Sequence, residues 1–524
     1  MQNIKLLDCT LRDGGYVNNW EFGKNVISRI VEKVLLSGID IVECGYLSQK
    51  NAGADDTARF NSIDDIRRAY MPVKSDNQQY AVMINFGEYP AGCLPDAPQD
   101  SPILRVAFHK KDMDKAFLYF EKLQEKGYKY FVQPMGALNY TDEEYVQLIH
   151  RTNALSAEAF YIVDSFGVME MKDFRRLLFL ADNNLDANIQ LGYHAHNNLQ
   201  QAYSNAKYMV EQNLEHDLII DASVFGMGRG AGNLNAELFA KYLNQNHGKS
   251  YNIEPLLEVF DECLKPIFIH SFWGYSLPFY LSSIHNCHPN YAMFFSEKNT
   301  LSIKSMHELL QMISEEDKTS FTKEKATEYY NKYQENYIDD SASLKELSNL
   351  LHNRNILILA PGKTIATYEE KIKFHIKENN PIIIGVNRVS EAYNYDFLFA
   401  SNEKRLTEAK PNNVRRFIKT SNLHKILDDT ILLNYASYVC SNEIVSEDPT
   451  LMLLNVLISI GIHKITIAGF DGFSTNPDEN YFAKGLSLGS NVSSKMKKNE
   501  AIRTELKKIT EKTNLTFLTP SKYV

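Results

Sequence analysis

The chain has 524 residues, of which 44% are hydrophobic and 23% charged, and its formal net charge at pH 7 is −9. It is too long for one ordinary core, so we expect two or three globular domains of a soluble protein. The charge disfavours a general nucleic-acid binder, and no apolar stretch approaches the ~20 residues of a membrane span. The chain enters a strand directly after Met1-Gln-Asn, so we expect no signal peptide. The six scattered cysteines favour the cytoplasm.

Over residues 1–245, short apolar segments alternate with amphipathic stretches such as Val26–Leu36, Met113–Lys126 and Asn198–Glu211. This alternation predicts βαβ units with a parallel sheet. About eight such units favour a closed (β/α)8 TIM barrel over a doubly wound open sheet. The predicted strands are residues 4–9, 39–46, 80–85, 102–107, 128–134, 160–164, 188–193 and 217–224.

The remaining chain predicts three further parts. Residues 246–340 lack strand alternation and predict a helical extension that caps the barrel or makes a subunit contact. Residues 341–353 are expected to be a linker. From residue 354 strands alternate with helices again, so residues 354–524 predict a Rossmann-like α/β domain. Its basic stretch, Lys495–Lys508, predicts a solvated helix face.

In a TIM barrel, catalytic groups lie at the C-terminal ends of the strands. Polar residues that merely mark strand termini explain some of the residues found there, but they explain less well why two histidines and several carboxylates gather. The predicted strand ends carry Asp8, Arg12 and Asp13, then Glu43, Asn85, Arg105, Gln133, Asp164, Ser165, His194 and His196, and finally the loop Gly226–Asn233.

His194 and His196 lie two positions apart at the end of one predicted strand. Such residues point to the same side with their Cα atoms ~6–7 Å apart, so both imidazoles can converge on one divalent metal. Arg12 and Asp13 lie between another strand end and a Gly-Gly turn, where site residues are common. On these residues alone, a surface Arg–Asp pair beside a turn is an equal alternative.

Three motifs in this order resemble the DRE-TIM metallolyase superfamily, which is HMG-CoA lyase-like. They are Asp8-x-Thr10-Leu-Arg12-Asp13-Gly-Gly, His194-x-His196-Asn-Asn and Gly226-Met-Gly-Arg-Gly-Ala-Gly-Asn233. The segment Gly192–Glu237 is most similar to the 4-hydroxy-2-oxovalerate aldolase branch. The resemblance covers roughly residues 1–300.

This resemblance implies that Asp13, His194 and His196 bind a divalent cation, Mn²⁺ or Mg²⁺, and leave positions open for substrate and water. Arg12 would stabilise the enolate of a 2-oxo acid, because a fixed cation and a Lewis acid then both face developing negative charge. Glu43 would orient a metal ligand or Arg12.

Other residues are implied less specifically. Asp164 and Ser165 resemble a strand end that lines the site, and Asn233 belongs to a loop near substrate. Tyr275 and Tyr280 lie in a segment like one that supplies a tyrosine, although aromatic packing explains both equally well. The His285 and His288 pair has metal-like spacing, but a structural or solvent-facing role is the simpler interpretation.

The chain departs from the family after the Arg-Asp-Gly motif, where the aldolases carry a catalytic histidine. The segment Gly15–Trp20 contains none. Tyr16 could transfer the proton through its hydroxyl or a bound water, although its reference pKa of ~10 makes it a poor base at neutral pH. The loop Arg229-Gly-Ala-Gly also lacks the Gly-Glu-Arg pattern of the acyl-CoA enzymes, which disfavours acetyl-CoA condensation.

The C-terminal domain is loosely similar to sialyltransferase-like and pterin-pyrophosphokinase-like Rossmann domains. Its Gly362 turn could meet a phosphate, so a nucleotide or nucleotide-sugar ligand is expected there, with a structural or oligomerising domain as the alternative.

The sequence therefore predicts a cytoplasmic, homo-oligomeric, metal-dependent aldolase that joins or cleaves a 2-oxo acid and an aldehyde. The aldehyde is expected to be a sugar or nucleotide-linked aldehyde of surface-polysaccharide biosynthesis. No nucleic-acid partner is expected. An acyl-CoA-dependent Claisen synthase or lyase and a non-catalytic scaffold are the alternatives.

Overall fold

The computed structural model divides into two compact units, Met1–Met293 with Glu315–Ser320, and Phe294–Ser314 with Phe321–Val524. It describes residues 2–49, 56–70, 77–155, 157–298, 300–335, 337–408, 412–425, 427, 429–476, 479–483 and 492–524. Within these residues, no helix combines the length and the apolarity needed to cross a membrane.

The first unit contains a closed parallel barrel. Its strands follow the order β1-β9-β8-β7-β6-β5-β4-β2, and β2 pairs with β1 through Leu7 and Ile41 to close the ring. A two-residue strand, β3 (Arg59–Phe60), extends β2. The closure confirms the predicted barrel and excludes the open sheet. The barrel strands are β1 (Ile4–Asp8), β2 (Ile41–Leu47), β4 (Gln79–Asn85), β5 (Ile103–Phe108), β6 (Tyr130–Pro134), β7 (Ala159–Asp164), β8 (Gln190–Ala195) and β9 (Leu218–Ala222).

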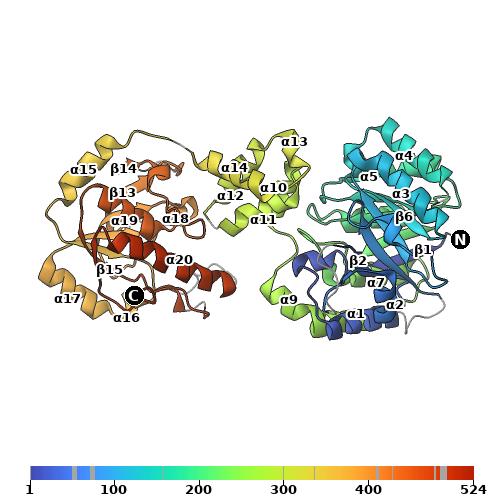
Figure 1. The fold of residues 1–524 in the computed structure, drawn as a ribbon, viewed down its shortest axis with the longest axis horizontal. Helices are drawn as coiled ribbons and strands as arrows, with labels where there is room; N and C mark the ends of the chain where they lie inside the picture. The colour runs from blue at the N-terminus through green and yellow to red at the C-terminus, as the bar shows by residue number, and fades with distance from the viewer. Residues whose placement is uncertain are drawn as a thin grey trace. The chain divides into compact units, whose positions relative to one another are not determined.

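Helices cover the outside of the strands (Figure 1). Each buries one apolar stripe, as in α1, where Ile27, Ile30 and Val34 face the barrel. α4 begins with a capping box in which Thr141 and Glu144 satisfy each other's backbone amides. These helices are α1 (Lys24–Leu36), α2 (Ile63–Tyr70), α3 (Met113–Glu125), α4 (Asp142–Ala154), α5 (Met171–Asn184), α6 (Ala202–Glu211) and α7 (Ala236–Asn246).

Alternation along the strands decides which side chains enter the barrel. Ile41, Ile103 and Ile219 belong to the buried cluster inside the ring. The residues two positions further along these strands are Glu43, Arg105 and Asp221, so they point the same way, and all three are buried. Short apolar strands thus carry charged groups to the C-terminal end of the barrel.

The chain continues after the barrel as a helical extension. α8 (Glu254–Val259) runs through a π-helical turn, Phe260–Leu264, into α9 (Lys265–His270). α10 (Leu277–Ile284), α11 (Pro289–Lys298) and α13 (Glu315–Lys318) follow, and the boundary between the two compact units falls within α11. The remaining helices of the predicted extension, α12 (Ile303–Met312) and α14 (Lys323–Gln334), belong to the second unit.

The second unit is built on a parallel sheet of order β14-β13-β12-β11-β10-β15-β16. Chain order reverses between β10 and β15, which are neighbours. This confirms a second parallel α/β domain. Its strands are β10 (Ile356–Leu359), β11 (Ile382–Val386), β12 (Tyr395–Ala400), β13 (Val414–Thr420), β14 (Thr430–Leu433), β15 (Lys464–Ala468) and β16 (Asn514–Phe517), and its further helices are α15 (Ser341–Leu351), α16 (Thr364–Thr367), α17 (Glu369–Asn379), α18 (Glu403–Glu408), α19 (Pro449–Ser459) and α20 (Val492–Thr510).

In the segment predicted to be a linker, residues 341–353, Ser341–Leu351 form α15. Leu347 and Leu351 on this helix are fully buried in the same apolar cluster as Ile358 and Ile431 of the sheet. The segment is therefore part of the second unit's core. The predicted domain boundaries at 245 and 340 stay predictions.

Candidate active site

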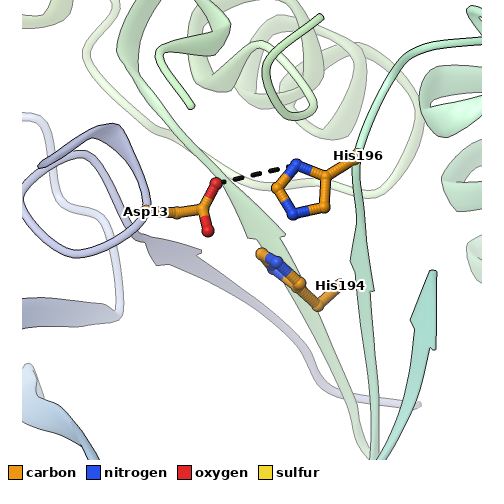
Figure 2. Close-up of side chains that lie close together, drawn as sticks. All are labelled: Asp13, His194 and His196. Atoms are coloured by element: carbon orange, nitrogen blue, oxygen red, sulfur yellow. Dashed lines mark ion pairs between the residues drawn. The ribbon is translucent and has the colours of Figure 1, made fainter. Parts of the chain in front are cut away.

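Asp13, His194 and His196 lie together at the C-terminal end of the barrel (Figure 2). One ligand atom from each residue lies within 4.8 Å of the others, and all three side chains are buried. Asp13 Oδ2 is 3.7 Å from Nδ1 of His196. A carboxylate and two imidazoles in this arrangement are a suitable donor set for a divalent cation.

Local backbone structure positions these three groups. His194 is in β8, and His196 follows the strand, held by its amide donating to the carbonyl of Asp164 (3.1 Å). Gly192 precedes them in the strand, and a Cβ there would lie 2.4 Å from the ring of Tyr161, so a larger residue would displace the strand. The amide of Asp13 donates to the carbonyl of Cys9 (2.9 Å), which folds the turn after β1 toward the histidines.

A second layer of polar groups holds the same residues. Asp221 Oδ2 lies 3.0 Å from Nδ1 of His194, and Asn233 Nδ2 donates to Asp13 Oδ2 (2.9 Å). Metal-binding histidines commonly carry such a carboxylate partner. Asp221 was missed in the sequence because it lies inside a short apolar strand, β9 (Leu218–Ala222).

Electrostatics hold Asp13 ionised and His196 neutral. Burial alone would raise the pKa of Asp13, but His196 and Arg12 outweigh it and hold that pKa well below its usual range. Burial lowers the pKa of His196 to about 3, so its imidazole is neutral. Nδ1 of His196 is buried and has no hydrogen-bond partner among the described residues. A buried imidazole nitrogen without a hydrogen-bond partner fits a metal ligand.

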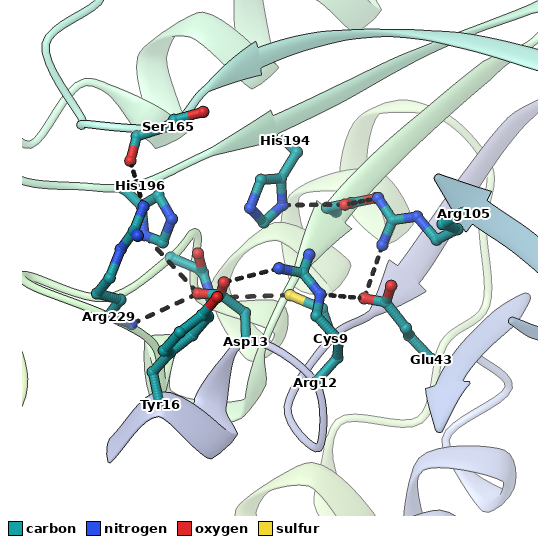
Figure 3. Close-up of polar contacts among 12 residues, drawn as sticks. Cys9, Arg12, Asp13, Tyr16, Glu43, Arg105, Ser165, His194, His196 and Arg229 are labelled. Carbon is teal, nitrogen blue, oxygen red and sulfur yellow. Dashed lines mark hydrogen bonds and ion pairs between the residues drawn. The ribbon is translucent and has the colours of Figure 1, made fainter. Parts of the chain in front are cut away.

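Arg12 lies beside this triad (Figure 3). Its Nη1 donates to Asp13 Oδ1 (2.7 Å) and its Nε to Glu43 Oε2 (2.8 Å). Trp20 Nε1 donates to the carbonyl of Arg12 (2.7 Å). The third nitrogen, Nη2, is buried with no partner in the described part of the chain. Arg12 therefore presents one desolvated donor from a guanidinium that is fixed on its other sides.

Arg105 completes a buried charge network. It pairs with Glu43 Oε2 through Nη1 (2.7 Å) and with Asp221 through Nη2. Burial would raise the pKa of Asp221, yet Arg105 and His194 hold it below its usual value. Arg105 thus links the partner of Arg12 to the partner of His194, a role that the sequence alone did not show.

Tyr16 is 36% exposed, at the open side of this cluster. Its hydroxyl lies 3.2 Å from that of Tyr46, and its ring is 4.6 Å from the ring of Trp20. Burial raises the pKa of Tyr46 well above the ordinary value, so Tyr46 keeps its proton.

The predicted substrate residues divide into two groups. Asn233 belongs to the cluster through Asp13, and Ser165 is close to it, since its carbonyl accepts from Arg229 Nη2 (2.8 Å) and its hydroxyl from the amide of Gly136 (3.0 Å). Asp164 instead accepts the amides of Val168 and Met169 (both 3.0 Å), which shapes the loop after β7.

Tyr275 is 51% exposed, and no hydrogen bond or ring contact joins it to the site within the residues that the structure describes. Arg229, by contrast, is a site residue that the sequence indicated only as part of the loop Gly226–Asn233. Its amide lies 3.4 Å from Asp13 Oδ2, and its guanidinium carbon is 5.4 Å from the ring centre of Tyr16.

Residues 3–259 match the model of the HMGL-like family. The barrel is an HMGL-like domain. The matched range contains Arg12 and all three residues of the triad, so the family match and the site cover the same part of the chain.

Curated relatives align with about half of the chain. The chain is similar to the 4-hydroxy-2-oxovalerate aldolase of Chloroflexus aurantiacus, with 26% identity over 50% of this chain and 73% of the relative. It is also similar to the oxaloacetate decarboxylase of Mycobacterium tuberculosis, with 24% identity over 48% of this chain and 74% of the relative.

Among solved structures, the HMG-CoA lyase of Brucella melitensis matches with a TM-score of 0.41 and 14% identity, over 51% of this chain and 100% of that chain. The N-terminal domain of a candidate aldolase from Bacteroides vulgatus matches with a TM-score of 0.48 and 25% identity, over 58% of this chain and 99% of that chain.

Proposed function

We propose that the HMGL-like domain is a divalent-metal-dependent aldolase, a carbon–carbon lyase acting on a 2-oxo acid of the pyruvate type and an aldehyde. The observation that carries this proposal is the buried Nη2 of Arg12, a donor without a partner among the described residues, beside the triad Asp13, His194 and His196. The names of the curated relatives support the reaction class.

Asp13, His194 and His196 would hold the cation, with Mn²⁺ or Mg²⁺ as the proposed ions. When bound, it would supply a Lewis acid for the carboxylate and keto oxygens of the 2-oxo acid. The donor set fits, because one carboxylate is held ionised and one imidazole is held neutral by its surroundings.

Arg12 is proposed to bind the keto oxygen. When the C3–C4 bond of a 4-hydroxy-2-oxo acid breaks, its electron pair moves into the 2-oxo acid fragment, and negative charge accumulates on that oxygen. A fixed, desolvated guanidinium stabilises this charge without reorganisation. Glu43 and Asp13 orient the guanidinium, and Arg105 orients Glu43.

Tyr16 is proposed to move the proton at the C4 hydroxyl. Its hydroxyl is in hydrogen-bond range of Tyr46, which stays protonated and can donate to the Tyr16 oxygen. Asp164, Ser165, Asn233 and Tyr275 remain proposals as substrate residues, with the contacts of Asn233 and Ser165 favouring those two.

The test is release of pyruvate from 4-hydroxy-2-oxo acids by the full chain with Mn²⁺. We expect turnover that a chelator abolishes. Protein that binds no Mn²⁺ and releases no pyruvate from any such acid would favour a binding scaffold. CoA-dependent turnover would favour the acyl-CoA enzyme. Oxaloacetate belongs in the assay, because its decarboxylation produces the same pyruvate enolate.

The second unit is proposed to bind a nucleotide or nucleotide-sugar. This ligand would supply a sugar or nucleotide-linked aldehyde for surface-polysaccharide synthesis. The protein is proposed to be a cytoplasmic homo-oligomer. Support for the nucleotide ligand comes from the reversal of chain order between β10 and β15, because ligands of open α/β sheets bind at such a point. At this point the loops after β10 and β15 are joined, because the amide of Thr364 donates to Asp471 (2.8 Å). Calorimetry with a nucleoside diphosphate tests the proposal, and the absence of binding heat would contradict it.

A further inference from the structure

An arginine at the C-terminal end of the barrel has no acidic partner. Arg59, in β3, makes no ion pair and no side-chain hydrogen bond with any residue that the structure describes. Its Nε is buried, although the side chain as a whole is partly exposed. By contrast, Arg12 and Arg105 of the site both pair with Glu43. A buried donor without a partner is costly, so Arg59 is a candidate for binding a ligand.

The backbone fixes Arg59 beside the end of β2. β3 pairs in parallel with β2, and Arg59 is in register with Tyr46. The amide of Tyr46 donates to the carbonyl of Ala58 (3.0 Å), and a Cβ at Gly45 would collide with that carbonyl oxygen, so glycine is needed for this approach. Residues in register on neighbouring strands point to the same face, so the side chains of Arg59 and Tyr46 share a face.

Trp20 connects Arg59 to the candidate active site. The guanidinium of Arg59 lies over the ring of Trp20, with its carbon 3.9 Å from the ring centre. The ring centre of Trp20 is 4.6 Å from that of Tyr16 and 5.4 Å from that of Tyr46. Its Nε1 also donates to the carbonyl of Arg12 (2.7 Å). One aromatic ring therefore separates Arg59 from Tyr16, the residue proposed to move the proton.

The position over Trp20 leaves the edge of the guanidinium free. An arginine that stacks on an aromatic face keeps its N–H groups in its own plane, where they bind a carboxylate or a phosphate through two parallel hydrogen bonds. Nη1 and Nη2 of Arg59 have no partner within the described residues, so both are available to a ligand.

A second cation adjoins Tyr16. The guanidinium carbon of Arg229 is 5.4 Å from the centre of the Tyr16 ring, and Figure 3 shows the two side chains together beside Asp13. Arg229 and Arg59 thus contact two aromatic rings that touch each other, those of Tyr16 and Trp20. Positive charge on both rings attracts an anion to this part of the site.

We propose that Arg59 is the subsite for an anionic group of the aldehyde, a carboxylate or a phosphate. This inference rests on the proposed aldolase function and names the chemical class of its second substrate. The carbonyl group then lies near Tyr16, and the anionic group lies one ring away on Arg59. Of the two aldehydes proposed above, a neutral sugar does not use this subsite, whereas a nucleotide-linked aldehyde brings phosphate to it.

The test compares variants that keep the packing on Trp20. Arg59→Met keeps an unbranched stem over the ring but removes the charge and the donors, and Arg59→Lys keeps the charge without the planar fork. Arg175→Met is the matched control. Arg175 is an exposed arginine of α5 whose guanidinium carbon lies 4.6 Å from the ring centre of Tyr208 on α6.

The assay measures kcat/KM for addition of pyruvate to two pairs of aldehydes, with the full chain and Mn²⁺. Each pair has one anionic and one neutral member. The phosphate pair is glyceraldehyde phosphate and glyceraldehyde, and the carboxylate pair is succinic semialdehyde and butanal. Exchange of the C3 protons of pyruvate in D₂O and Mn²⁺ titration are measured on the same proteins.

We expect wild-type protein to prefer the anionic member of at least one pair, and that pair then identifies the group as phosphate or carboxylate. Arg59→Met should lower kcat/KM for this aldehyde by about 10- to 100-fold relative to its neutral partner, as expected for the loss of a charge-assisted hydrogen bond. Arg59→Lys should recover part of the preference, and Arg175→Met should keep all of it.

Three results would overturn the subsite. The first is wild-type protein without a preference for the anionic member of either pair. The second is a preference that survives in Arg59→Met. The third is an equal loss of exchange, of addition to neutral aldehydes and of addition to anionic ones in Arg59→Met, because a purely structural Arg59 predicts that pattern.

The wild-type protein separates this inference from the function on which it rests. Exchange of pyruvate's protons without addition to any of the four aldehydes would overturn the subsite and leave the 2-oxo acid site intact. If wild-type protein neither binds Mn²⁺ nor exchanges these protons, the proposed function fails and the inference falls with it.

Discussion

The carboxylate of Asp221 lies 3.0 Å from Nδ1 of His194, and both side chains are buried. The pKa of Asp221 is held below its usual value, and an ionised carboxylate can only accept, so the neutral form of His194 has its hydrogen on Nδ1 and its lone pair on Nε2. Asp221 therefore selects the form of His194 that can bind a metal, and it does so from a neighbouring strand.

Replacing Asp221 by Asn should weaken Mn²⁺ binding about 10- to 100-fold, the usual cost of losing such a partner. Isothermal titration of the purified protein measures the affinity. Asp217→Asn is the matched control, because Asp217 lies four positions earlier, is exposed, and accepts the amide of Asn3 with its carboxylate (3.0 Å). Equal affinities in the two variants would contradict the role of Asp221.

Arg12→Lys keeps the positive charge but cannot contact Asp13, Glu43 and a substrate at once. We expect turnover to fall by about 10²- to 10³-fold with Mn²⁺ affinity little changed, because the lost interaction is made as charge develops. Steady-state kinetics with a 4-hydroxy-2-oxo acid give the comparison. A variant with full turnover would show that Arg12 does not stabilise the enolate.

Asp8 makes the stability of the barrel depend on pH. Burial raises its pKa to about 7, although it accepts the amide and hydroxyl of Thr10 (3.1 and 2.8 Å). Between pH ~4 and ~7 the folded state therefore holds more protons than the unfolded state, and the free energy of unfolding falls as pH rises, by up to about 1.4 kcal/mol per unit.

Asp8→Asn should remove this component, so that its free energy of unfolding falls less steeply over that range. Both tryptophans of the chain, Trp20 and Trp273, are in the first unit, so their fluorescence during urea unfolding follows this unit. Identical pH slopes in the variant and the wild type would show that Asp8 does not hold the proton.

Leu351→Ala tests whether residues 341–353 belong to the second unit's core. Leu351 is fully buried, so the variant should lose about 2–5 kcal/mol of that unit's stability. Far-UV circular dichroism follows its unfolding, and unchanged tryptophan fluorescence is the internal control for the barrel. A loss below about 0.5 kcal/mol, as for a surface site, would restore the linker interpretation.

Local pattern was sufficient for much of the fold. The barrel strands are short apolar runs between amphipathic helices, and the triad follows from motifs at strand ends. β13 and β16 give no clear strand pattern, because Val414–Thr420 carries Arg415, Arg416 and Lys419 and Asn514–Phe517 is a half-exposed edge strand. The burial of α15 depends on a sheet that forms later in the chain.

In the site, too, local sequence identifies some residues and long-range contacts determine the others. Asp13 and the two histidines could be found because each stands in a recognisable local sequence. Asp221 and Arg105 contact partners that are 27 and 116 positions away, so only the folded chain brings them together. Asp221 and Arg105 also lie in strands whose neighbours are apolar, where a charged residue gives no local indication of its partner.

Deuterium exchange into pyruvate tests the proposed metal-dependent aldolase function most directly. The exchange is expected to need the metal triad and Arg12, and it can be measured without an aldehyde. Mass spectrometry of pyruvate incubated in D₂O gives the rate. We expect wild-type protein with Mn²⁺ to exchange the C3 protons, and a chelator or His196→Ala to abolish the exchange. Wild-type protein that exchanges none of these protons, or exchanges them equally well with chelator present, would contradict a metal-dependent aldolase.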